Sequence, residues 1–282
     1  MGIVLALAAA LSWGTGDFLG GTATRREPVV TVAATTYLVG GVFLALVALP
    51  TGGSPTFGDL RLGALGGLAG LGGIVLLYHG LARGPMTVVA PVTGVVAAAL
   101  PLLWGLLSGE QIETVALIGV VAGLVAIVAI SAVPDPAAAA LDGARERRWV
   151  SVLTALAAGG GFGAFYIVLG RTSPDSGMWP LVAARGVSVL VMVPVVAALR
   201  TRFVPRTSRA TVAGAGIFDS GANALYLLAT RHGSITIAAL LASLYPAATV
   251  VLARLVHHER LGTVQLGGLA LAAVAVVLIS LG

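Results

Sequence analysis

The sequence contains no cysteine and no lysine, and it has few charges of any kind. Only 10% of its 282 residues are charged, and all sixteen basic residues are arginine. The lack of cysteine excludes disulfide bonds, thiol catalysis and thiolate metal sites. Soluble globular domains contain about 25% charged residues. The small charged fraction therefore indicates that most of this chain lies away from water.

Apolar residues take the place of the missing charges, with a hydrophobic fraction of 58% and a mean hydropathy of +1.02. They form ten runs of roughly 20 residues, which is the length that crosses a hydrocarbon core of about 30 Å as a helix. The runs span residues 2–21, 29–49, 61–82, 86–107, 113–133, 149–170, 178–199, 210–230, 234–256 and 262–281. This pattern predicts an all-α integral membrane protein with ten transmembrane helices.

The arginines are unevenly distributed between the predicted connections. Odd-numbered connections hold twelve and even-numbered connections three. Cytoplasmic loops of membrane proteins collect basic residues, so we expect a multi-pass protein of the cytoplasmic (inner) membrane with both termini outside. The same bias explains the net charge of +5 without nucleic acid as a partner. The lipid bilayer is the predicted environment, and the chain acts as a monomer or a homodimer.

The chain also repeats itself at an offset of 149 residues. Residues 84–131 align without a gap on residues 233–280 with 17 identities, which include Thr87 with Thr236 and Glu110 with Glu259. We therefore predict two five-helix repeats, at 1–138 and 139–282. Because each repeat has an odd number of spans, the second enters the membrane from the opposite side, so the repeats are inverted. Inverted repeats are typical of secondary transporters, which bind substrate between them near the membrane centre.

Short motifs stand at fixed places along the chain. They include Ser12-Trp13-Gly14 in the first run, the Gly109-Glu110 pair, the segment His258 to Leu261, and the proline of Leu244-Tyr245-Pro246. In this order they resemble the EamA-type members of the drug/metabolite transporter superfamily. The resemblance implies a ten-helix carrier of small metabolites, often an exporter of amino acids or related compounds, with a central cavity lined by both halves. Asp17 and Asp219 are not part of this pattern.

Three ionisable residues fall inside predicted spans: Asp17, Arg185 and Asp219. A charge at mid-bilayer costs at least about 2.5–3.5 kcal/mol, so such residues face a bundle interior or a wet cavity. One interpretation is a site for a zwitterion, in which the carboxylates also exchange a proton for a cationic group, with Asp219 as the principal acid. The alternative is a structural ion pair of Asp219 with Arg185, while Asp17 reaches Arg25.

We expect the cavity to be walled by the first, third, fourth, sixth, eighth and ninth spans. The predicted substrate-binding residues are Trp13, Asp17, Tyr37, Tyr78, Tyr166, Arg185, Asp219, Asn223, Tyr226 and Tyr245. Prolines interrupt the fourth and ninth spans and are candidate gates or passive kinks, namely Pro91, Pro101 and Pro246. Prolines in lipid need neighbours or water to satisfy the carbonyls that they release. No catalytic residue, metal ligand or cofactor is predicted.

These features favour a transporter of small molecules, an exporter of amino acids or similar polar metabolites that is coupled to protons. A multidrug exporter of lipophilic cations is the alternative within transport, since an aromatic cavity with a single carboxylate would suit it. An integral membrane enzyme would require an acidic or histidine cluster with metal or nucleotide spacing at one interface. The sequence has no such cluster, so we predict that the protein is not an enzyme.

Overall fold

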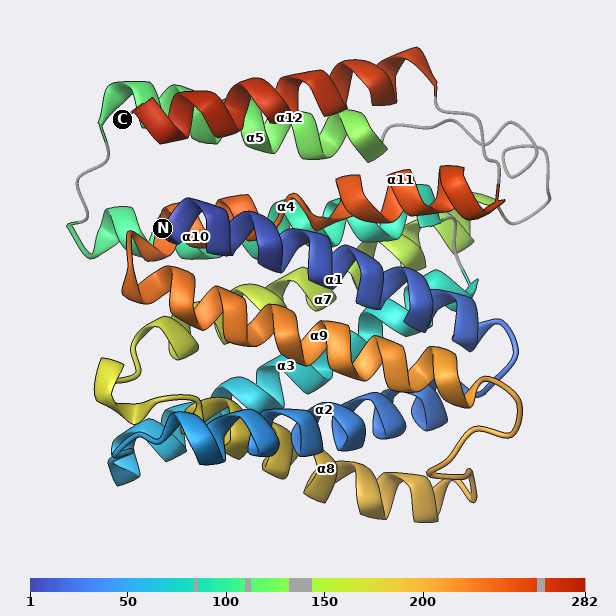
Figure 1. Cartoon of the computed structure of the whole chain (residues 1–282). Coiled ribbons are helices and arrows are strands. Elements are labelled where there is room, and N and C mark those ends of the chain that lie inside the picture. The colour runs from blue at the N-terminus through green and yellow to red at the C-terminus, as the bar shows by residue number, and fades with distance from the viewer. Residues whose placement is uncertain (84–85, 110–112, 132–143, 258–261, 282) are drawn as a thin grey trace.

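The computed structural model describes residues 1–83, 86–109, 113–131, 144–257 and 262–281, and within these ranges the regular structure is helical. The long helices lie side by side and roughly antiparallel (Figure 1). Their bounds are α1 Gly2–Thr24, α2 Val29–Thr51, α3 Phe57–Arg83, α4 Met86–Leu107, α5 Thr114–Ser131, α7 Ala144–Gly170, α8 Trp179–Ala198, α9 Arg209–Arg231, α10 Ile235–Ala242, α11 Tyr245–His257 and α12 Thr263–Leu281, with a 3₁₀ turn η1 at Pro174–Ser176.

Six of these helices are long and apolar enough to cross a membrane. They are α1, α2, residues 57–80 of α3, residues 152–170 of α7, α8 and α9. An α-helix satisfies its own backbone hydrogen bonds, which is what a segment surrounded by lipid requires. Every other predicted run also coincides with helix within a few residues, but the described apolar stretches there are shorter.

The ninth predicted run is not continuous, since α10 ends at Ala242 and α11 begins at Tyr245. Proline has no N–H to donate, and its ring collides with the carbonyl of the fourth residue before it. For Pro246 that residue is Ala242, where α10 ends. The proline therefore accounts for the break between the two helices.

Small residues let the helix backbones touch. A Cβ atom added to Gly67 would lie 2.3 Å from the carbonyl oxygen of Ala184, and one added to Gly63 would lie 2.2 Å from that of Pro180. Glycines spaced four apart permit this approach in membrane helices. The spacing of Gly63 and Gly67 on α3 predicts a packing surface, and this surface contacts α8.

The helices of the two halves pack in a reciprocal pattern. α1 lies along α9 as α7 lies along α3, and α2 contacts α9 as α8 contacts α3, while α5 and α12 contact each other. The polypeptide runs in opposite directions in α1 and α7, the first long helix of each half, and also in α2 and α8 (Figure 1). α1 begins and α12 ends at the same end of the bundle.

Candidate functional site

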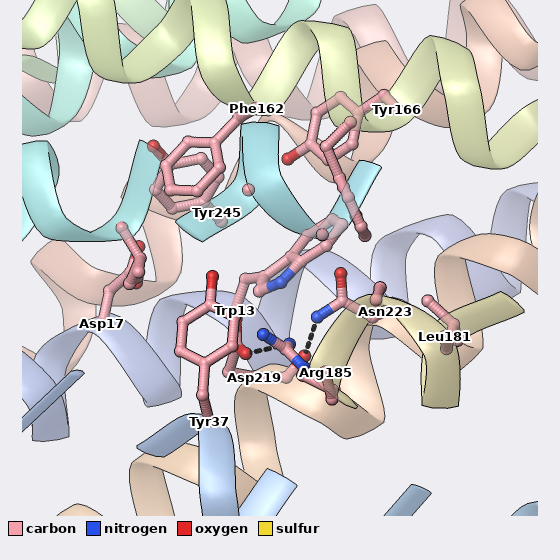
Figure 2. A pocket seen from close by; sticks show the side chains of 15 residues that line it. Trp13, Asp17, Tyr37, Phe162, Tyr166, Leu181, Arg185, Asp219, Asn223 and Tyr245 are labelled. Atoms are coloured by element: carbon pink, nitrogen blue, oxygen red, sulfur yellow. Dashed lines mark hydrogen bonds and ion pairs between the residues drawn. The ribbon is translucent and has the colours of Figure 1, made fainter. Parts of the chain in front are cut away.

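A pocket lies at the centre of the bundle, between helices that come from both halves (Figure 2). Its cavity volume is only about 30 Å³. The pocket in this conformation is therefore narrow. Its lining residues are Trp13 and Asp17 of α1, Tyr37 of α2, Gly67, Gly70 and Ile74 of α3, Phe162, Phe165 and Tyr166 of α7, Leu181, Ala184 and Arg185 of α8, Asp219 and Asn223 of α9, and Tyr245 of α11.

An ion pair joins two of the pocket helices. A terminal nitrogen of Arg185 on α8 donates to a carboxylate oxygen of Asp219 on α9, and the side chains are 7% and 13% exposed. The guanidinium carbon of Arg185 also lies 4.2 Å from the ring centre of Tyr37, which is a cation–π contact. The carboxylate and the aromatic ring therefore fix the position of Arg185 in the pocket.

Asn223 stands one helical turn beyond Asp219, as the spacing predicts. Its side-chain nitrogen donates to the main-chain carbonyl of Asp219 at 2.6 Å, and its own side chain is buried. This bond holds the amide against α9. The side-chain carbonyl oxygen of Asn223 is then available to accept a hydrogen bond. Asp219 and Asn223 together make the polar part of the α9 wall.

Asp17 is the third ionisable residue of the pocket lining. In Figure 2 it stands apart from the pair formed by Arg185 and Asp219. Among the described residues, no arginine forms an ion pair with Asp17. The two carboxylates of the pocket thus differ: that of Asp219 is neutralised by a guanidinium in direct contact, and that of Asp17 is not.

Aromatic rings of α1, α7 and α9 pack together beside the pocket. Trp13 packs on Tyr166 with ring centres 5.3 Å apart and on Tyr226 with ring centres 5.8 Å apart, and the two tyrosine rings are 4.8 Å from each other. The hydroxyl group of Tyr226 donates to the main-chain carbonyl of Tyr166 at 3.3 Å. Tyr226 is fully buried and supports Trp13 and Tyr166 from behind, outside the lining.

Eight of the ten predicted substrate-binding residues line the pocket and two do not, and the part that all ten play in binding stays a prediction. Besides Tyr226, Tyr78 lies outside the lining: it is buried in α3 with its hydroxyl group against α1, where a Cβ atom on Gly20 would lie 2.2 Å from it. The predicted walls also change, because α2 and α8 contribute lining residues, whereas none of the described lining residues belongs to α4. The close approach to Gly20 of α1 therefore holds Tyr78 outside the lining.

Of the three prolines that were predicted as gates, Pro101 and Pro246 do not belong to the described pocket lining. Pro91 lies within α4, and Pro246 is the second residue of α11 after the break in the ninth run. The carbonyl oxygen of Pro101 accepts a hydrogen bond from the hydroxyl group of Thr236 on α10 at 3.5 Å. Pro101 and Pro246 lie in the two segments that the internal repeat relates to each other, residues 84–131 and 233–280. Their use as gates stays a prediction.

Sequence reasoning did not include seven of the lining residues in the site: Gly67, Gly70, Ile74, Phe162, Phe165, Leu181 and Ala184. Two signals could have found part of this set. Phe162 aligns with Trp13 at the offset of 149. Gly67 and Gly70 belong to pairs of glycines spaced four residues apart, which mark a close approach of helices.

Comparison with known proteins places this geometry in context. The model of a family described as "EamA-like transporter family" matches residues 1–132 and 149–281. A solved structure titled only "Crystal structure of protein" has a similar fold, with a TM-score of 0.76 and 17% sequence identity, over 99% of this chain and 96% of that chain. No curated protein has a sequence that matches the chain. The family model covers both halves of the chain.

Proposed function

The chain belongs to the EamA-like transporter family, a family of multi-pass membrane transporters of the drug/metabolite transporter type, and from this premise we propose that it exports small polar metabolites by alternating access. The family model matches once in each half. The reciprocal packing of α1 with α9 and α7 with α3, and the opposite course of α1 and α7, support two inverted five-helix repeats. In such proteins the substrate site lies between the repeats and is exposed to each side in turn.

The observation that carries the proposal is the charge of the central pocket. Asp17, Arg185 and Asp219 together leave one net negative charge, and it belongs to Asp17. An uncompensated charge surrounded by a low-dielectric bundle is costly. We therefore assign to Asp17 the group that exchanges a proton for the amine of the substrate. Asp219, the stronger candidate from the sequence, instead positions Arg185.

The substrate class follows from the same three groups. An amino-acid-like zwitterion would place its amine against Asp17 and its carboxylate against the unoccupied donors of Arg185. Arginine has five N–H donors, and one terminal nitrogen is engaged by Asp219. The cavity is small, so either the substrate is small or the helices separate to admit it.

A second candidate, a monovalent organic cation, is favoured by one specific observation. Arg185 already has an anionic partner and an aromatic one, while Trp13 and Tyr166 offer ring faces of the kind that attract ammonium groups. Thermal unfolding of the purified protein with an amino acid and with the amine formed by its decarboxylation separates the two classes. Stabilisation by the amino acid alone supports the zwitterion, and stabilisation by the amine alone supports the cation.

Transport into proteoliposomes across an imposed pH gradient tests the role of Asp17. Asn keeps the shape and hydrogen bonding of Asp but does not titrate, so we expect Asp17→Asn to lose the dependence on the gradient. Asp219→Asn removes the partner of Arg185, and we expect at least a tenfold loss of rate at every pH. Glu113→Gln, at an exposed acid outside the pocket lining, is the matched control. Wild-type rates and pH profiles for both pocket variants would refute the proposal.

A further inference from the structure

Two clusters of hydrogen bonds join the halves at opposite ends of the bundle. The first, which we name the Glu27 latch, links residues 25–28 between α1 and α2 to residues 205–208 before α9. The Oε1 atom of Glu27 accepts from the main-chain N–H of Thr207 at 2.8 Å and from its hydroxyl group at 2.9 Å. These bonds fix the α1–α2 connection of one half to the α8–α9 connection of the other.

The second cluster, the Asp59 latch, links residues 54–59 at the start of α3 to residues 173–177 between α7 and α8. The Oδ1 atom of Asp59 accepts from the main-chain N–H of Ser173 at 2.7 Å. The N–H of Ser54 donates to the carbonyl of Asp175 at 2.8 Å. Arg231, the last residue of α9, donates to the carbonyl of Gly177 at 2.7 Å and so ties the same connection to a pocket helix.

The internal repeat relates the two latches to each other. At the offset of 149, residues 25–28 correspond to residues 174–177, and residues 56–59 correspond to residues 205–208. The segments that meet in the Glu27 latch are therefore the counterparts of those that meet in the Asp59 latch. Figure 1 shows that the α1–α2 and α8–α9 connections lie at one end of the bundle, and the α2–α3 and α7–α8 connections at the other.

We infer that the Glu27 latch and the Asp59 latch are the two gates of the pocket, and that they open alternately. This inference rests on the proposed function, because gates at both ends are needed only if the pocket is exposed to each side in turn. Both latches are closed in this structure, and the narrow pocket between them agrees with an occluded conformation. Arginines surround the Glu27 latch, at positions 25, 26, 206 and 209, so this gate faces the cytoplasm.

Each gate is assigned to named pairs because the bonds made by Glu27, Ser54 and Asp59 cross from one half to the other. Rocking of one repeat against its partner around the pocket separates the segments at one end and keeps those at the other end together. Opening the Glu27 end breaks the bonds between Glu27 and Thr207. Opening the Asp59 end breaks the bond between Asp59 and Ser173 and that between Ser54 and Asp175.

Cross-linking tests this assignment directly, since the sequence has no cysteine of its own. One variant carries Glu27→Cys with Thr207→Cys, and the other carries Ser54→Cys with Asp175→Cys, each linked by a short, reducible bis-thiosulfonate reagent. Ser54 and Asp175 are exposed, and their latch bond is between main-chain atoms, so substitution leaves it in place. A control pair within one half and outside the latch, Ala198→Cys with Arg202→Cys, lies at the Glu27 end and is also exposed.

We expect either latch cross-link to reduce transport at least tenfold, reduction of the linker to restore it, and the control cross-link to leave it unchanged. A second readout needs no substrate: each latch variant also carries Leu181→Cys in the pocket lining. The side chain at position 181 is buried in the closed structure, so the linker reacts with the latch thiols and leaves the pocket thiol free. A membrane-impermeant thiol reagent should then label it only from the side opposite to the linked latch.

The two readouts distinguish failure of the gates from failure of the proposed function. Side-specific labelling without transport of any amine or amino acid supports the gates and overturns the proposed substrate. Labelling of Leu181→Cys from both sides in both linked proteins overturns the gates. Undiminished transport with either latch linked overturns them as well.

Discussion

Replacing Gly67 with alanine should separate α3 from α8 and destabilise the protein. The added Cβ atom would lie 2.3 Å from the carbonyl oxygen of Ala184 and 2.6 Å from its Cα atom, both of which are backbone atoms. Ordinary contact begins at 3.4 Å, so α8 has to retreat by about 1 Å. Overpacking of this kind costs about 1–3 kcal/mol. We expect a lower unfolding temperature for Gly67→Ala in detergent.

The same helix offers a matched control. A Cβ atom on Gly72 would meet nothing within 4 Å, and alanine is favoured over glycine in a helix by about 1 kcal/mol. We therefore expect Gly72→Ala to unfold at the wild-type temperature or above it. The retreat of α8 also carries Arg185, the neighbour of Ala184, away from Asp219, so Gly67→Ala should transport more slowly. If Gly67→Ala is as stable as Gly72→Ala, the close approach of α3 and α8 is wrong.

The helical segments were predictable because hydropathy alone limits where a chain enters lipid. The ends of two helices were missed for an identifiable reason. Helix α3 starts at Phe57 rather than 61, because Asp59 is polar and ends the apolar run, yet its side chain accepts from the main-chain N–H of Thr56 at 2.9 Å and stabilises the first turn. Helix α7 starts at Ala144 rather than 149, since the polar residues that precede the span are good helix formers.

The charged part of the site was predictable, and its aromatic part only partly so. Asp17, Arg185 and Asp219 stand out because charge is rare in an apolar span, and all three line the pocket. Aromatic residues are compatible with lipid, with packing and with a pocket, so composition does not say which way they point. Tyr226 follows Asn223 on the same face of α9, but stacking on Trp13 and Tyr166 holds it behind the lining.

The different roles of the two carboxylates could be assigned only from the structure. The sequence favoured Asp219 as the principal acid, because it lies near the middle of its span, whereas Asp17 lies toward the end of α1. Depth does not reveal a partner on another helix. The contact with Arg185 neutralises Asp219, so the deeper acid is the less available one.

Three further predictions concern single contacts. Tyr37→Leu removes the ring beneath the Arg185 guanidinium and should cost about 0.5–2 kcal/mol in thermal unfolding, whereas Tyr37→Phe keeps the ring face and should cost less; equal losses would exclude the cation–π contact. Tyr226→Phe removes a buried hydrogen bond to the Tyr166 carbonyl, so it should cost about 1 kcal/mol while the transport rate stays at the wild-type value, and a loss of rate would return Tyr226 to the binding site. The Glu27 latch should depend on pH only in acid. Hydrogen bonds from the main-chain and side-chain groups of Thr207 lower the pKa of Glu27 below its ordinary value of 4.5. A carboxyl with a lowered pKa stabilises the closed latch fully above that ordinary value, and the contribution is lost as pH falls through the lowered pKa. Because a thiol reacts as its thiolate, the labelling rate of Ser208→Cys at the latch is divided by that of Arg202→Cys, an exposed position in the same connection. This ratio should therefore be constant from about pH 8 to pH 5 and rise below 4.5. Glu27→Gln in the same background should remove the acid dependence of the ratio, because glutamine does not titrate. A ratio that changes near neutral pH with glutamate and with glutamine at position 27 would show that another group controls this end of the bundle.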